Sequence, residues 1–275
     1  MEVLVPDGVG TAEALARVTH LGIGAHQDDL EFFAFHGISQ CFQKEDQWFG
    51  GITCTDGRGS VRQGSYSGTS DDELKRIRRD EQNRAAELGQ YGAMIQLDYS
   101  SVQIKAPKYQ ETVTEDIRNL LEATKPRVLY LHNPADKHDT HVAVFQRSLD
   151  ALRQIPREQL PAQVFGCEVW RDLDWLPDDL KVALPVGNHM DLQRDLNRVF
   201  DSQISGGKRY DLAVMGRRRA HATFHEAHSA DQAEGYTFAM DLNPLVQDAS
   251  LSTEVFLEGV LKVFKEDILK RIART

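Results

Sequence analysis

The stretch that decides the fold is residues 20–31, HLGIGAHQDDLE. Its first half, residues 20–25, is a short apolar run without strict alternation, which is typical of a strand buried on both faces of a parallel sheet. Charge begins directly after it, and Leu30, Phe33 and Ile38 then continue an apolar face at roughly helical spacing. The stretch therefore predicts a buried strand, a tight polar turn and a helix.

The same alternation of strand and helix recurs along the first half of the chain. Apolar runs predict three further strands at residues 48–54, 94–97 and 128–131. Segments with helical period lie between and after them, at residues 71–88, 113–121 and 142–152. This order predicts right-handed crossovers and a doubly wound, mostly parallel α/β sheet, Rossmann-like, with helices on both faces.

The second half is less regular. Residues 163–170 and 182–186 predict two more strands, which we expect to be antiparallel additions at a sheet edge. Helices are expected near residues 192–200 and, as an amphipathic helix, over residues 255–272. Because no internal repeat or clear linker is present, residues 1–275 are interpreted as one domain, whose C-terminal half completes the sheet edge and the mouth of the site.

Composition and charge exclude several classes of function. The 275 residues carry 32 basic and 42 acidic side chains, a formal charge of −10, so the electrostatic footprint of a nucleic-acid-binding protein is missing. No run approaches ~18 apolar residues, so no membrane span is expected. The first residues lack the pattern of a secretory leader, and three scattered cysteines indicate neither disulfides nor a thiolate metal site. We expect a cytoplasmic protein with a small-molecule partner, which could form a homo-oligomer.

Two polar clusters follow predicted strands. The first, residues 26–31 (HQDDLE), places an imidazole beside adjacent carboxylates, whose mutual repulsion a cation would relieve. Taken alone, this cluster has another interpretation. Asp28 or Asp29 could cap the helix, and Glu31 could interact favourably with the helix dipole. The first cluster therefore leaves a helix cap and a metal site as alternatives.

The second cluster, residues 132–141 (HNPADKHDTH), holds three histidines and two aspartates directly after the fourth predicted strand. If the first and fourth strands are neighbours in a doubly wound sheet, both clusters meet in the crevice at its switch point. His26, Asp29 and His141 can then supply the three ligands of a catalytic zinc ion. The same set also accepts iron, cobalt or nickel.

Two side chains beside this set suggest roles in hydrolysis. Asp28 is free to take the proton of a water molecule acidified by the metal. His138 precedes His141 by three residues and shares roughly its helical face, so it could stabilise negative charge in a transition state.

Four segments also match a known set of motifs in the same order. Residues 25–31 (AHQDDLE) are similar to A-H-P-D-D-x-E, and residues 136–141 (DKHDTH) are similar to D-x-H-P-D-H. Between them, residues 55–57 (TDG) resemble a T-x-G loop, and residues 78–89 resemble an R-x-x-E-x-x-x-A-x-x-L-G helix. These are the motifs of the PIG-L (LmbE-like) zinc N-deacetylases, which the chain resembles over about residues 18–155.

The resemblance implies a doubly wound α/β fold and zinc-dependent removal of an acyl group, usually acetyl, from the nitrogen of an amino-sugar conjugate. It implies His26, Asp29 and His141 as zinc ligands, and Asp28 as the general base. His138 would assist the oxyanion or the leaving amine. The alternatives are a non-catalytic metal- or carbohydrate-binding relative and an amidase for a larger N-acyl group.

The chain departs from the motifs at two positions. Gln27 replaces the proline after the first histidine, which should alter the rigidity of the loop and not the ligands. Thr140 replaces the aspartate before the last ligand. If that aspartate normally orients an imidazole, Asp136 or Asp139 must replace it here.

Other polar residues have alternative interpretations. Arg78 in the helix, and Asp56 and Arg58 in the Gly-rich loop, are candidates for substrate contact. Residues 217–219 (RRR) are either a solvated helix face or an anion contact at the site. Among the remaining histidines, His20, His36, His132 and His189 are interpreted as structural, although His132 is close enough to support the site. His221, His225 and His228 belong to a solvated helix, to the crevice mouth or, for His221 and His225, to a second metal.

Overall fold

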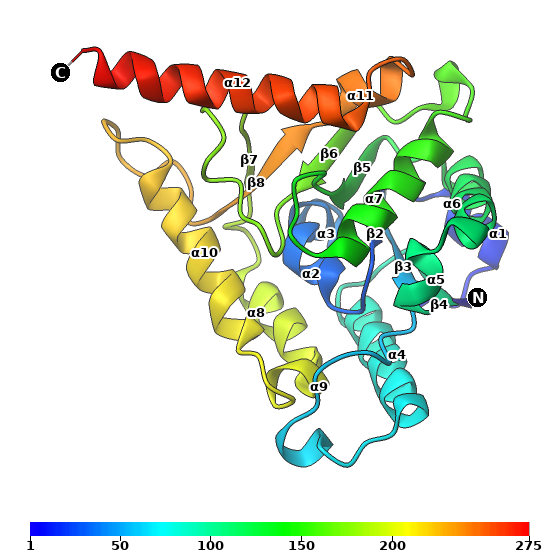
Figure 1. Cartoon of the computed structure of the whole chain (residues 1–275). Helices are drawn as coiled ribbons and strands as arrows, with labels where there is room; N and C mark the ends of the chain where they lie inside the picture. Colours follow the sequence, from blue (N-terminus) through cyan, green and yellow to red (C-terminus); the bar gives the residue numbers. More distant parts are fainter. Residues whose placement is uncertain (275) are drawn as a thin grey trace.

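The computed structural model describes residues 1–274. One eight-stranded mixed sheet runs through it in the order β1-β4-β3-β2-β5-β6-β8-β7 (Figure 1). The strands are β1 (Glu2–Leu4), β2 (His20–Gly24), β3 (Phe49–Thr55), β4 (Ala93–Tyr99), β5 (Val128–His132), β6 (Gln163–Cys167), β7 (Val182–Pro185) and β8 (Tyr236–Asp241).

The order of the strands in the sheet determines where a crevice can form. Strands β4, β3, β2, β5 and β6 are parallel, and β2 pairs directly with β5, with Ile23 opposite Leu131. The chain therefore reverses its winding direction between β2 and β5, where a doubly wound sheet opens a crevice at the carboxyl ends of its strands. The predicted fold class and the predicted neighbourhood of these two strands are confirmed.

Helices cover both faces of the sheet, which explains why the central strands are apolar on both sides. Two apolar cores result, one under α1, α6 and α7 and the other under α2, α3, α4 and α8. The helices are α1 (Thr11–Ala16), α2 (Asp29–Phe33), α3 (Phe35–Cys41), α4 (Asp71–Leu88), α5 (Ser101–Lys105), α6 (Gln110–Thr124), α7 (Asp139–Leu152), α8 (Met190–Val199), α9 (Asp201–Ile204), α10 (Tyr210–Phe224), α11 (Asn243–Gln247) and α12 (Thr253–Ile272), with short 3-10 turns η1 (Gly64–Tyr66), η2 (Pro107–Tyr109) and η3 (Arg157–Gln159).

The edges of the sheet differ from the prediction. The strand expected at residues 163–170 is β6, and it pairs in parallel with β5, so the antiparallel expectation was wrong there. The crossover through α7 returns the chain to the same end of the sheet, as a β–α–β unit requires. The strand expected at residues 182–186 is β7, which is antiparallel to β8 at the edge, as predicted. Strands β1 and β8 were not predicted.

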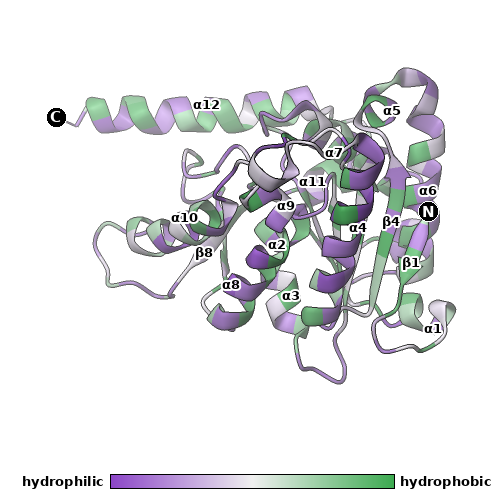
Figure 2. Ribbon diagram, turned by 90° about the horizontal axis from the view of Figure 1, so that it is seen from below, coloured by the Kyte–Doolittle hydropathy of each residue, from purple (hydrophilic) through white to green (hydrophobic). Residues whose placement is uncertain are grey.

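Helix α12 follows the predicted bounds, but its apolar stripe is not buried. Leu261 is 52% exposed and Ile272 is 63% exposed, whereas Val260 is buried. The helix runs along one side of the molecule in Figure 1, and its C-terminal part projects beyond the body in Figure 2. Within residues 1–274, no helix combines the length and the apolar character that a membrane crossing requires.

A partly buried histidine makes stability depend on pH. The Nδ1 atom of His36 lies 2.8 Å from the Tyr130 hydroxyl, and burial lowers the pKa of His36 to about 4. Between pH 6.5 and about 4 the unfolded chain therefore binds a proton that the native state refuses, so the free energy of unfolding falls as the pH is lowered. We expect His36→Gln to make this fall shallower, measured by urea unfolding across the window. The exposed control His228→Gln should keep the wild-type slope, and coincident slopes for all three proteins would contradict this account.

Candidate metal centre

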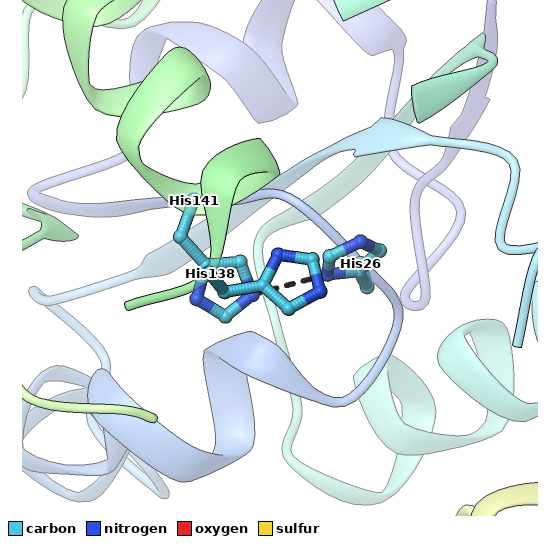
Figure 3. A group of neighbouring side chains, drawn as sticks. All are labelled: His26, His138 and His141. Atoms are coloured by element: carbon cyan, nitrogen blue, oxygen red, sulfur yellow. Dashed lines mark hydrogen bonds between the residues drawn. The ribbon is translucent and has the colours of Figure 1, made fainter. Parts of the chain in front are cut away.

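Three side chains meet at the carboxyl ends of β2 and β5. His26 Nδ1 lies 3.2 Å from His141 Nε2 and 3.3 Å from Asp29 Oδ2, and His141 Nε2 lies 3.4 Å from Asp29 Oδ1. We call His26, Asp29 and His141 the acceptor cluster. Figure 3 shows the rings of His26 and His141 approaching each other, with His138 beside them. Two segments more than a hundred residues apart in sequence thus form one cluster.

A sharp turn brings the first two members together. Asp28 has a left-handed backbone, with φ of 94°, which an aspartate tolerates better than most residues. The turn is held because the Asp28 N–H donates to Gln82 Oε1 at 3.2 Å and Arg78 donates to the carbonyl of Gln27. The N–H of His26 donates to Asp29 Oδ2 at 2.7 Å, so the Asp29 carboxylate folds back toward the end of β2.

His141 is held in one orientation by Asp136. Its Nδ1 lies 3.3 Å from Asp136 Oδ2, and burial lowers the pKa of His141 to about 3, so the ring is neutral near pH 7. With the proton on Nδ1, the lone pair of Nε2 faces His26 and Asp29. This is the arrangement that carboxylates impose on metal-binding histidines. Asp136 is itself fixed by N–H groups of Lys137 and His138, at 2.6 and 3.2 Å.

His132 belongs to the same cluster of rings. Its ring stacks on His141 with centroids 3.9 Å apart, and its Nε2 accepts the N–H of Ala25 at 2.9 Å. The same atom lies 3.3 Å from Asp29 Oδ2. His132 is therefore a buried ring that packs against the acceptor cluster, which agrees with its interpretation as structural and with its predicted proximity to the site.

The residues of the acceptor cluster fit a divalent metal ion. Burial raises the pKa of Asp29, but contacts with His141, His132 and His26 outweigh it and hold this pKa well below the usual value. A carboxylate and two imidazole nitrogens then face one another at 3.2–3.4 Å in a buried place, which requires a shared cation or proton. Two histidines and one aspartate are a donor set of catalytic zinc sites.

The acceptor cluster opens into a pocket of about 690 Å³. From the first half of the chain the pocket is lined by Asp28, Arg78, His138 and Thr140. Loops and α10 of the second half also contribute, with Trp170, Lys208, Tyr210, Arg217 and Arg218 among their lining residues. The cluster is thus accessible to a small molecule from one side.

Asp28 lies beside the acceptor cluster, and its pKa is shifted in the opposite direction to that of Asp29. Burial raises its pKa well above the usual value, and although Arg78 opposes this, the nearby Asp29 and Glu31 reinforce it. The Arg78 Nη2 atom lies 3.4 Å from Asp28 Oδ2, and Arg78 also donates to Ser60 Oγ and the Gln27 carbonyl. Arg78, which was predicted to contact substrate, therefore lines the pocket, but its guanidinium contacts groups of the protein itself: Asp28, Ser60 and the Gln27 carbonyl.

The remaining predicted residues are placed differently. Asp56 and Arg58 pair with each other at 2.7 Å, and neither lines the pocket. Asp139 is exposed in the first turn of α7, so of the two aspartates expected to support His141 only Asp136 contacts it. Thr140 is buried and lines the pocket.

The arginine run at residues 217–219 divides between pocket and solvent. Arg218 is buried and donates to the carbonyls of Glu31 and Phe32 at 2.9 and 2.6 Å, which ties α10 to α2. Burial lowers its pKa to about 9. Arg217 also lines the pocket, whereas the side chain of Arg219 is 65% exposed. Of the three arginines, only Arg219 lies on a solvated face of the helix. Arg217 and Arg218 point toward the pocket.

The histidines near the end of α10 do not form a second metal site. His221 Nδ1 lies 3.0 Å from Glu168 Oε1, and its ring stacks on Phe238. The helix ends at Phe224, so His228 lies beyond it. Among residues 1–274, the groupings of side chains able to hold a metal include none of His221, His225 and His228.

Sequence reasoning missed the aromatic part of the pocket. The ring of Trp170 lies 6.1 Å from that of His138, and Tyr210 lies 6.2 Å from Trp170 and 5.3 Å from Phe32. Trp170 follows β6 and Tyr210 opens α10, and neither belongs to a motif. Their position depends on how the second half packs, which no local pattern records.

The fold and the acceptor cluster define a doubly wound α/β protein with a candidate metal centre. Residues 21–152 match the sequence model of the GlcNAc-PI de-N-acetylase family, PIG-L, so the chain is similar to that family over this segment. No curated protein matches the sequence.

Several solved structures share the fold at low sequence identity. N,N'-diacetylchitobiose deacetylase from Pyrococcus horikoshii is 17% identical, with a TM-score of 0.61 over 85% of this chain and 88% of that one. A deacetylase of teicoplanin biosynthesis is 16% identical, with a TM-score of 0.57 over 81% and 97%. The 4-carboxy-2-hydroxymuconate hydratase from Pseudomonas putida KT2440 is 16% identical, with a TM-score of 0.62 over 82% and 95%. Since a hydratase shares the fold, the reaction must be argued from the site.

Proposed function

We propose that the protein is a metal-dependent N-deacetylase that removes an acyl group, acetyl in the first instance, from the nitrogen of an amino sugar or a related conjugate. The observation that carries this proposal is the acceptor cluster beside the buried Asp28 at one wall of a pocket. The match of residues 21–152 to a de-N-acetylase family supports the same reaction class.

His26, Asp29 and His141 would hold the ion, for which zinc suits the donor set best and iron, cobalt or nickel are alternatives. A bound divalent ion lowers the pKa of a water molecule and polarises a carbonyl oxygen.

The side chains around the cluster supply the proton transfers. Asp28 accepts a proton from the attacking water, and its raised pKa favours the protonated form that results. The oxygen of that water bonds to the acyl carbon, the carbon–nitrogen bond breaks, and Asp28 returns the proton to the leaving nitrogen. Arg78 fixes the Asp28 carboxylate. His138 donates a hydrogen bond to the acyl oxygen, a role that the 5.0 Å separation of its ring from that of His26 supports.

An assay of acid release separates this proposal from its rivals. Release of acetate from N-acetyl amino sugars that a chelator stops would support the deacetylase. Release only of longer acids would favour an amidase for larger acyl groups. A metal-replete protein that binds such sugars and releases no acid would favour a non-catalytic role, and addition of water to a carbon–carbon double bond would favour a hydratase.

The contact between Asp136 and His141 can be tested by a matched pair of substitutions. We expect Asp136→Asn to weaken metal binding about 10–100-fold, because it removes the carboxylate that fixes the His141 tautomer. Asp139→Asn, an exposed change three residues away, should leave metal affinity as in the wild type. Competition with a metallochromic chelator measures both, and equal affinities for the two variants would contradict the role of Asp136.

A further inference from the structure

Helix α12 carries apolar side chains that the rest of the described chain, residues 1–274, leaves exposed. Of its 20 residues only Val260 is buried, and Leu261, Ile268 and Leu269 are each at least 40% exposed. Figure 2 shows hydrophobic residues along the whole helix, including the part that projects beyond the body. Because helices in proteins are stabilised mainly by the packing of an apolar face, we expect a partner to cover this one.

The apolar residues of α12 recur at the spacing of a coiled-coil seam. Leu257, Leu261, Phe264 and Ile268 follow one another at intervals of four, three and four residues, as the two apolar positions of a heptad do. We call these four residues the α12 seam. Leu257 packs on the core and the ring of Phe264 lies 5.8 Å from that of Trp175, whereas Leu261 and Ile268 are exposed. The seam therefore follows the border between the body and solvent, where a second helix can lie along it.

The charges of the helix show which partner fits the seam. Two ion pairs lie within α12, Lys262 with Glu266 at 4.0 Å and Arg271 with Asp267 at 2.8 Å. The other charged side chains of residues 253–274 form no ion pair within the described chain. They are acidic in the first part of the helix and basic in the second: Glu254, Glu258, Lys265, Lys270 and Arg274. A second helix with the same sequence, running in the opposite direction, presents the complementary charges.

We infer that α12 pairs with α12 of a second copy of this chain, antiparallel and along the α12 seam. In the register that places Leu261 beside Phe264 of the second copy, Ile268 lies beside Leu257 of that copy. Both exposed seam residues are then covered, and the same contact forms twice about a twofold axis. The projecting end of each helix lies along the attached end of the other.

This register also places opposite charges together. Glu258 and Lys265 each follow a seam residue by one position, so they lie on the same flank of the seam. In an antiparallel pair residues of this kind face each other, so Glu258 of one copy lies near Lys265 of the other, twice by symmetry. A parallel pair would bring neither residue to an opposite charge.

Sedimentation equilibrium of the full chain measures this self-association. We expect a mass of at least twice the 31.0 kDa of one chain. Leu261→Gln combined with Ile268→Gln should raise the dissociation constant of the pair more than about 100-fold, because each copy loses two buried apolar side chains. Leu212→Gln is the control, since Leu212 is a 60% exposed leucine on α10 and outside the seam. All three positions are exposed, so circular dichroism should show wild-type folding for each variant.

Charge reversal tests the antiparallel arrangement. Glu258→Lys places like charges side by side and should weaken the pair about fivefold. Adding Lys265→Glu to the same chain restores opposite charges across the seam, so the double variant should associate about as tightly as the wild type.

Single cysteines give an independent measure of direction, because the three native cysteines are buried. In the antiparallel register two copies of position 261 are offset by three residues, roughly 4–5 Å along the helix axis, and two copies of position 268 by eleven residues, roughly 16 Å. A short bis-maleimide should therefore join two chains that carry Leu261→Cys far more readily than two that carry Ile268→Cys.

The outcomes decide the surface and its geometry separately from the proposed function, because no readout uses metal or catalysis. A wild type that stays monomeric, or self-association that the double glutamine variant leaves intact, would overturn the α12 seam as an interface. Binding of the monomer to phosphatidylcholine–phosphatidylglycerol vesicles would then assign the seam to a membrane surface. Equal cross-linking at positions 261 and 268, or no recovery by Lys265→Glu, would overturn the antiparallel pairing.

Discussion

Replacing Asp28 by asparagine is expected to lower kcat for acyl release by about 10²–10⁴-fold, the usual contribution of a positioned general base. Asparagine keeps the size of the side chain and tolerates the left-handed backbone that Asp28 adopts, so the turn that places Asp29 should persist. What is lost is the buried carboxylate that faces the pocket between Arg78 and the acceptor cluster. Metal content should therefore stay at the wild-type level while turnover falls.

The measurement is acetate release under saturating substrate, with metal content determined on the same samples. Asp139→Asn is the appropriate control, since it also removes one carboxylate from a motif residue but at an exposed position. A full rate in metal-replete Asp28→Asn would remove Asp28 from the mechanism. A loss of metal together with the rate would instead make Asp28 a part of the metal site.

The second large effect is expected from His141→Ala. This change removes the Nε2 atom that faces both His26 and Asp29, so metal affinity should fall by more than about 100-fold, beyond the loss typical of an outer partner such as Asp136. Acyl release should fall with it. Isothermal titration with zinc measures the affinity, and His228→Ala, at an exposed histidine outside the site, should bind as the wild type does.

A folding defect can be separated from the loss of a ligand. The His141 ring is buried against His132, so alanine leaves a cavity, and the melting temperature of the metal-free variant should be compared with that of the metal-free wild type. Wild-type zinc affinity in a folded His141→Ala protein would contradict the assignment of this residue to the acceptor cluster.

The parts of the site that could be predicted from sequence are those that follow strands. Residues 26–31 and 132–141 each come directly after a buried apolar run, and strand pairing in a doubly wound sheet then brings them together. Local pattern was sufficient because the distance between the clusters is set by adjacent strands.

The rest of the site depends on tertiary packing. Trp170 and Lys208 lie outside regular elements, and Tyr210 and Arg217 come from a helix whose burial is decided by its contact with α2 through Arg218. Asp56 and Arg58 were predicted from the loop motif to contact substrate. They do not line the pocket, because the two side chains form an ion pair with each other. The parallel pairing of β6 with β5 could not be predicted from the sequence either, because it follows from the crossover through α7 and not from the composition of the strand.

The central claim is most directly tested by metal content measured alongside acid release. The purified protein should hold about one divalent ion per chain and release acetate from an N-acetylated amino sugar. Chelation should abolish both, and restored zinc should recover both. Acetate release that continues at full rate from metal-free protein would contradict the account, as would a fully metal-loaded protein that releases no acid from any N-acyl sugar.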